Sequence, residues 1–123
     1  MAKVLIVEDE ESLRDVYKEE FESEGFTVET AIDGQEGFEK MVSFLPELVL
    51  LDMYMPKMSG FDVLKSVKNT PALKNIPIVI LTNINPDVQD LMKNLGVSYF
   101  LLKADNTPGQ VVDRARMILN IKK

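Results

Sequence analysis

The sequence predicts an α/β fold in which a parallel sheet of five strands is covered by helices on both faces. Five short apolar runs alternate strictly with stretches whose apolar residues have helical spacing, as in successive strand–helix units. One run, Leu48–Leu51, consists of four aliphatic residues bounded by turn signals, which is typical of a strand buried on both faces. With right-handed crossovers, these units form a doubly wound sheet.

Composition limits both the number of domains and the available chemistry. The 123 residues suit one domain, which we expect to span 1–123, and 46% hydrophobic with 28% charged residues is typical of a globular protein. Cysteine and histidine are absent, which excludes disulfides, the usual zinc sites and Ser–His triads. The net charge of −6 disfavours direct binding to nucleic acid. Since the sequence has neither a membrane-length apolar run nor a signal peptide pattern, we expect a cytoplasmic protein without membrane contact.

The first strand–helix unit starts near the N-terminus. The aliphatic run Lys3–Val7 predicts a strand, which we place at the centre of the sheet. An acidic cluster, Glu8–Glu11, follows it and suits the positive end of a helix. Gly25 is placed to end that helix as the residue after its C-cap. The apolar residues spaced for one face of the helix are Leu13, Val16, Tyr17 and Phe21.

The second unit joins an alternating strand to a short helix. Residues Phe26–Ile32 alternate apolar and polar side chains, as a half-buried or edge strand does. Asp33 and Gly34 mark a turn, and Gly37 should weaken the following helix by about 1 kcal/mol relative to alanine. The apolar residues of that helix are Phe38, Met41 and Val42.

The last three units repeat the alternation. The third strand, Leu48–Leu51, ends at Asp52, and its helix carries Phe61, Leu64 and Val67. Ile76–Leu81 predicts the fourth strand, with Pro77 tolerated at its start. The fourth helix has Pro86 in its first turn and carries Val88, Leu91, Met92 and Leu95. Tyr99–Leu102 predicts the fifth strand. The last helix begins with a capping box formed by Thr107, Pro108 and Gln110, and it carries Val111, Val112, Ala115, Ile118 and Leu119.

Polar side chains gather at one edge of this predicted sheet. We expect the flavodoxin-like strand order 2-1-3-4-5, in which the carboxyl ends of strands 1, 3, 4 and 5 lie side by side. The residues at those ends are Glu8 and Asp9, Asp52, Thr82 and Lys103. Each has an ordinary structural explanation, such as a helix-start charge or a turn hydroxyl. Their coincidence at four strand ends favours a functional site.

The chemistry of these side chains indicates phosphoryl transfer. Three carboxylates placed close together repel one another and need a cation or a shared proton. Mg²⁺ meets that need because it prefers oxygen ligands and keeps waters for a phosphate-bearing substrate. Lys103 supplies a charge for an anion, Thr82 a hydroxyl donor, and Asp52 can itself be the nucleophile. The turn after the first strand lacks glycine, so neither a dinucleotide fingerprint nor a phosphate-binding loop is present.

These residues resemble the receiver domains of response regulators in two-component signalling. The resemblance runs from Lys3 to about Leu119, and it is carried by the acid pair after the first strand, the segment DMYMPKMSG that begins at Asp52, Thr82 and Lys103. It implies a stand-alone, CheY-like receiver in which Asp52 accepts a phosphoryl group from a phosphohistidine of a sensor histidine kinase. Such a protein is a switch that assists its own phosphorylation and dephosphorylation, not an enzyme.

The resemblance also implies a ligand set and a switch. The magnesium ligands would be Asp9, Asp52, the main-chain carbonyl of Tyr54 and, in a supporting role, Glu8. Lys103 would pair with the phosphoryl oxygens, Thr82 would swing to hydrogen-bond them, and Phe100 would turn inward. The output surface would be the fourth helix, fifth strand and fifth helix. This surface would contact a downstream protein and is a candidate for phosphorylation-dependent homodimerisation.

Three positions depart from the family's pattern. Ala104 stands where proline usually follows the lysine, and because a cis bond before a non-proline residue costs roughly 3 kcal/mol, we predict a trans bond there. Asn83 replaces the usual small residue after the threonine and should affect access to the phosphoryl group or its lifetime. Phe100 stands where tyrosine is common, so it can be buried without a hydroxyl, and Tyr99 should point to the opposite face.

Two other interpretations stay open. A binding scaffold with receiver architecture would signal without phosphorylation, although the intact set of aspartate, acid pair, threonine and lysine argues against it. A phosphotransfer enzyme of the haloacid-dehalogenase type also uses an aspartate at a strand end. It would need a second aspartate two residues after Asp52, where Tyr54 stands.

Overall fold

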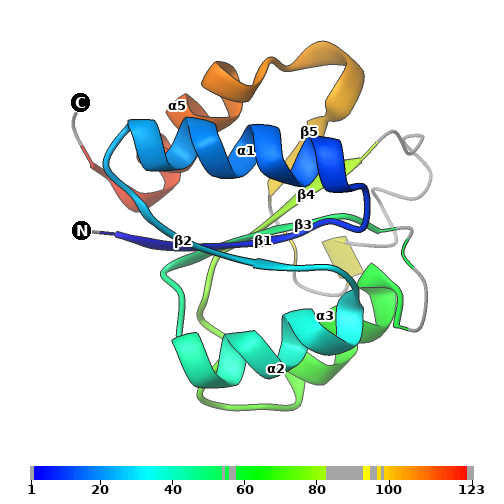
Figure 1. Cartoon of the computed structure of the whole chain (residues 1–123). Helices are drawn as coiled ribbons and strands as arrows, with labels where there is room; N and C mark the ends of the chain where they lie inside the picture. The colour runs from blue at the N-terminus through cyan, green and yellow to red at the C-terminus, as the bar shows by residue number, and fades with distance from the viewer. Residues whose placement is uncertain are drawn as a thin grey trace.

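A five-stranded parallel sheet forms the centre of the protein in the computed structural model (Figure 1). The structure describes residues 2–53, 55, 58–82, 93, 94, 97 and 99–121. The strands are β1 Lys3–Val7, β2 Thr27–Ala31, β3 Leu48–Leu51, β4 Ile78–Thr82 and β5 Tyr99–Leu102. Their order is β2-β1-β3-β4-β5, and each neighbouring pair is parallel. The predicted fold class and strand order are therefore confirmed.

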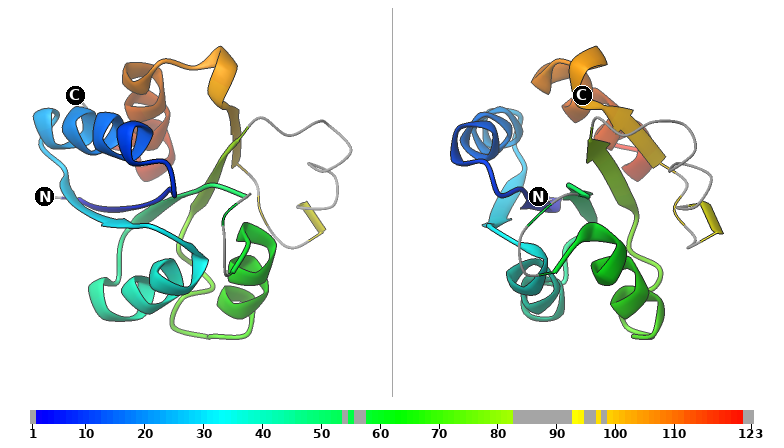
Figure 2. Two further views of the ribbon diagram at one scale, coloured as in Figure 1. Left: turned by 45° about the vertical axis from the view of Figure 1, so that its right-hand side comes forward. Right: turned by 90° about the vertical axis from the view of Figure 1, so that its right-hand side faces the viewer.

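Helices cover both faces of the sheet. Those described are α1 Glu11–Ser23, α2 Gly34–Phe44, α3 Gly60–Lys68, α5 Pro108–Leu119 and a short 3-10 helix, η1 Lys103–Asp105. Helices α1 and α5 lie on one face, and α2 and α3 lie on the other, as the two further views also show (Figure 2). Most of the predicted fourth helix, which has Pro86 in its first turn, lies outside the described residues. None of the described helices combines the length and apolar character needed to cross a bilayer.

Strand alternation divides the core between the two faces of the sheet. In β1, Val4 and Ile6 pack on the side of α1 and α5, whereas Leu5 and Val7 pack on the side of α2 and α3. All four side chains of β3 are at most 2% exposed. Burying a side chain of this size contributes roughly 1.5–3 kcal/mol, so the central strands anchor the fold and fix the position of the residues that follow them.

The helix ends follow local chemistry. Ser59 and Thr107 each begin a helix with a complete capping box, and the Asp33 carboxylate accepts a 2.8 Å hydrogen bond from the Glu36 amide at the start of α2. Gly25 has a φ of 93° after α1, which confirms the predicted helix end. The predicted capping box at Thr107 is therefore confirmed, and the box at Ser59 is an additional one that the sequence analysis did not predict.

Some sequence predictions are wrong in detail. Val16 and Val42, expected on buried helix faces, are 44% and 52% exposed, because each helix buries a narrower stripe against the sheet. Strand β4 starts at Ile78 rather than Ile76, since Pro77 has no amide proton and contributes only its carbonyl, which accepts from the Val49 amide at 3.0 Å. Gly37 has a packing role as well as a helix penalty. A Cβ there would lie 2.9 Å from Val7 Cγ atoms, so the glycine lets α2 approach β1.

Candidate functional site

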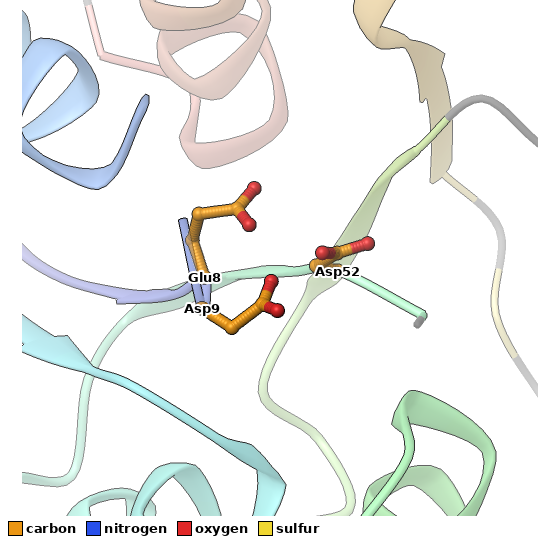
Figure 3. A group of neighbouring side chains, drawn as sticks. All are labelled: Glu8, Asp9 and Asp52. Carbon is orange, nitrogen blue, oxygen red and sulfur yellow. The ribbon is translucent and has the colours of Figure 1, made fainter. Parts of the chain in front are cut away.

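Three carboxylates converge where β1 and β3 end (Figure 3). One oxygen of Glu8, one of Asp9 and one of Asp52 all lie within 4.8 Å of one another. The strands pair in register up to Val7 and Leu51, and the Asp52 amide then donates to the Val7 carbonyl at 3.1 Å. The sheet register therefore places all three acids at one edge, as predicted. Glu8 and Asp52 are 3% and 6% exposed, whereas Asp9 is open to solvent.

Lys103 enters this acidic group from the end of β5. Its Nζ donates to Glu8 Oε1 at 2.7 Å and lies 3.5 Å from Asp52 Oδ2. The other Glu8 oxygen, Oε2, accepts from the Glu10 amide at 3.2 Å. Glu8 is thus held at both oxygens, and the lysine stands between the two buried acids with its closer contact on Glu8.

Burial and charge shift the titration of these groups. Burial raises the pKa of Glu8 to about 7; the hydrogen bond from Lys103 opposes this rise and the negative charge of Asp52 adds to it. Burial alone would lower the pKa of Lys103, but its hydrogen bond to Glu8 and the charges of Asp52 and Glu8 outweigh burial and raise it. The lysine therefore stays cationic while Glu8 holds its proton unusually well.

The donor set fits a hard divalent cation. Among the described residues, the ion pairs of the site join Lys103 to Glu8 and Asp52, so one ammonium group balances only part of the charge when all three carboxylates are ionised. Oxygens from three side chains within 4.8 Å of one another are the kind of ligand that Mg²⁺ prefers, and the exposure of Asp9 leaves a side open to solvent. The geometry is thus compatible with the magnesium site that the sequence predicts.

Other predicted site residues are only partly covered by the structure. Thr82 is the last residue of β4, and its backbone pairs with Leu102 at the same edge of the sheet, but its side chain lies outside the described residues. Tyr54 and Asn83 also lie outside them. Phe100 is half-buried against the core on the side of α2 and α3.

Two predictions about the β5 end can be checked directly. In the register of β4 and β5, Tyr99 pairs with Val79 and Phe100 pairs with Ile80. Val79 and Ile80 belong to the cores on opposite faces of the sheet, and Tyr99 is 37% exposed. Tyr99 and Phe100 therefore alternate as predicted. The described chain contains no cis peptide bond, so the bond between Lys103 and Ala104 is trans, which is also as predicted.

Two residues of α1 reach the site that sequence analysis did not assign to it. Arg14 donates from Nη1 to the main-chain carbonyls of Glu8 at 3.0 Å and Asp9 at 3.4 Å. Tyr17, expected only as a core residue, lines a cavity of about 10 Å³ together with Glu8 and Asp52. Burial raises the pKa of the Tyr17 phenol. The charge of Lys103 opposes this rise, and the charges of Glu8 and Asp52 add to it. Arg14 and Tyr17 are three residues apart, which places them on the same face of α1, and this spacing is the sequence signal that could have linked them.

Comparisons with known proteins agree with this geometry. The sequence model of the response regulator receiver domain family matches residues 4–115 of this chain. The solved structure of the chemotaxis protein CheY4 of Vibrio cholerae is 31% identical, with a TM-score of 0.89 over 96% of this chain and 98% of that one. A CpxR homolog of Haemophilus influenzae, a transcriptional regulatory protein, is 34% identical over 97% of this chain and 51% of its own length. The phosphate regulon regulator PhoB of Rhizobium meliloti is 29% identical over 97% of this chain and 52% of its own. The chain thus spans about half the length of these two regulators.

Proposed function

Because the chain belongs to the response regulator receiver domain family of two-component signalling, we propose that Asp52 is its phosphoacceptor. We propose that residues 1–123 form one receiver that works in the cytoplasm and takes its phosphoryl group from a sensor histidine kinase. The observation that carries this proposal is the placement of Asp52. The residue is 6% exposed, and its carboxylate lies beside Glu8 and Asp9 and 3.5 Å from the Lys103 ammonium.

The proposed reaction is an in-line displacement at phosphorus. A carboxylate oxygen of Asp52 forms the new O–P bond as the N–P bond of the phosphohistidine breaks, and the imidazole leaves with the electron pair of that bond. Lys103, whose Nζ lies 3.5 Å from Asp52 Oδ2, would stabilise the negative charge on the phosphoryl oxygens. Such a protein is a phosphoacceptor switch rather than a conventional enzyme.

Magnesium belongs to the same proposal. Its ligands would be Asp9, Asp52, the main-chain carbonyl of Tyr54 and, in a supporting role, Glu8. The ion would supply positive charge against the phosphoryl oxygens. Without the ion, the Lys103 ammonium offsets part of the repulsion between Glu8 and Asp52, because it lies 2.7 Å from one carboxylate and 3.5 Å from the other.

We propose a switch between this site and an output surface. Thr82 would respond to the phosphoryl group through its hydroxyl, and Phe100, half-buried at the α2 and α3 face, would turn further inward. The surface changed by these movements would be the fourth helix, β5 and α5. We expect it to bind a downstream protein rather than nucleic acid, since the chain carries a net charge of −6. Phosphorylation-dependent homodimerisation through this surface belongs to the same proposal.

Intact-mass measurement after incubation with acetyl phosphate and Mg²⁺ tests the proposal. We expect a labile gain of one phosphoryl group that is absent without Mg²⁺ and absent from Asp52→Asn. Asp62→Asn is a matched control, because Asp62 is an exposed aspartate of the Ser59 capping box and should leave uptake intact. A parallel incubation with a phosphorylated histidine kinase covers poor reactivity with the small donor. No adduct from either donor would overturn the proposal in favour of a scaffold that signals without phosphorylation.

A further inference from the structure

The start of α1 is held differently from the start of the other described α-helices. Asp33, Ser59 and Thr107 each cap a helix through a side-chain oxygen, whereas Glu10, at the N-cap of α1, makes no such bond. A missing cap of this kind typically lowers stability by about 1 kcal/mol. The turn between β1 and α1 must therefore be fixed by other contacts.

Arg14 provides those contacts. It is the fourth residue of α1, and its Nη1 atom donates to the main-chain carbonyls of Glu8 at 3.0 Å and Asp9 at 3.4 Å. The Arg14 amide also donates to the Glu10 carbonyl at 2.9 Å. One side chain therefore spans the two peptide groups on which two of the three site carboxylates depend.

Asp9 depends most on this support. Glu8 has a partner on each carboxylate oxygen, namely Lys103 and the Glu10 amide. Among the described residues, no hydrogen bond or ion pair is made by the Asp9 carboxylate, which is exposed. Its direction is consequently set by its backbone, and Arg14 is the side chain that holds that backbone.

We propose that Arg14 is a positioning residue of the acidic site, which fixes the Glu8 and Asp9 peptide groups so that both carboxylates face Asp52 before a cation binds. This inference rests on the proposed function, because it concerns the same magnesium site. The proposed role requires no contact of Arg14 with the cation or the phosphoryl group, because it acts through the Glu8 and Asp9 carbonyls.

Charge and positioning predict opposite results, which makes the idea testable. As a nearby cation, the guanidinium repels Mg²⁺, so its removal should tighten binding if charge were its only effect. As a positioning group, it pre-forms the ligand set, and removing such support typically weakens metal binding by about 10-fold or more. The sign of the change in affinity therefore separates the two roles.

The experiment is a calorimetric Mg²⁺ titration of the full chain and of Arg14→Gln, Arg14→Lys and Arg114→Gln, with urea unfolding of each. Arg114 is an exposed arginine of α5 and controls for the loss of one positive charge. We expect Arg14→Gln to bind Mg²⁺ about 10-fold more weakly, Arg14→Lys to fall between it and the unaltered chain, and Arg114→Gln to bind normally.

Equal or tighter binding by both Arg14 variants would overturn the inference while leaving the proposed function intact. No Mg²⁺ binding by the unaltered chain would contradict the proposed function itself. Should Arg14→Gln fail to fold, Arg14→Lys decides the question alone, together with amide exchange at Glu10 and Glu11 in metal-free buffer. We expect faster exchange at these two amides in the variant and unchanged exchange in α5.

Discussion

The start of α5 is held by a capping box between near neighbours in the sequence, whereas the junction between β1 and α1 is held by two side chains outside it, Arg14 of α1 and the distant Lys103. Thr107 and Gln110 exchange hydrogen bonds across one helical turn to start α5. At the start of α1, Glu8 is instead bound by Lys103, 95 positions away in the chain. At the β1–α1 turn, contacts from other elements therefore take the place of a local cap, and the same turn carries two of the site carboxylates.

The largest expected effect is on the rate of phosphoryl uptake when Lys103, the distant partner of the β1–α1 junction, is replaced. Lys103→Met removes the ammonium that lies between Glu8 and Asp52, at 2.7 Å and 3.5 Å. We expect phosphoryl uptake from acetyl phosphate to slow by about 100-fold, as for loss of one preorganised donor to developing charge. Lys68→Met, at an exposed position of α3, should leave the rate unchanged. A rate within a few-fold of the unaltered chain would show that Lys103 serves only to pair with Glu8.

The same junction should make stability depend on pH. The Glu8 carboxyl has an ordinary pKa of 4.5 in the unfolded chain and, because of burial, one of about 7 in the folded protein. The folded state therefore holds more protons between these values, and its free energy of unfolding should fall as pH rises from about 4.5 to 7 and then level off.

Urea unfolding in metal-free buffer measures this dependence. The slope should largely disappear in Glu8→Gln, which cannot titrate, and the difference between the two proteins isolates the contribution of Glu8 from that of other acids. A difference that stays constant across this pH range would contradict the shifted pKa.

The smallest expected effects concern the two helix starts. Thr107→Ala removes a cap and should lower the free energy of unfolding by about 1 kcal/mol without changing Mg²⁺ affinity. Glu10→Ala removes a side chain that makes no cap bond, so its effect should stay within about 0.5 kcal/mol. Equal losses in both variants would show that the two junctions are stabilised in the same way.

The same contrast explains what sequence alone could predict. The bounds of β1, β3 and β5 and the capping box at Thr107 follow from residues next to one another, and each was predicted as found. The convergence of Glu8, Asp9, Asp52 and Lys103 also followed, because strand order brings their positions to one edge.

What the sequence missed depends on packing across the fold. The exposure of Val16 and Val42 depends on the rotation of each helix about its own axis relative to the sheet, which the apolar periodicity does not determine. The closer contact of Lys103 with Glu8 than with Asp52 depends on ångström-scale geometry. The sequence analysis assigned no role to Arg14, because its contacts with the Glu8 and Asp9 carbonyls depend on the path of the β1–α1 turn.

The central claim is that Asp52 is the phosphoacceptor at this edge of the sheet. Borohydride reduction of the acetyl phosphate-treated protein, followed by peptide mass spectrometry, tests it most directly, because reduction converts an aspartyl phosphate into homoserine. We predict homoserine at position 52 and unmodified aspartate at Asp9. Homoserine at another position, or at none in protein that has gained a phosphoryl group, would contradict the account.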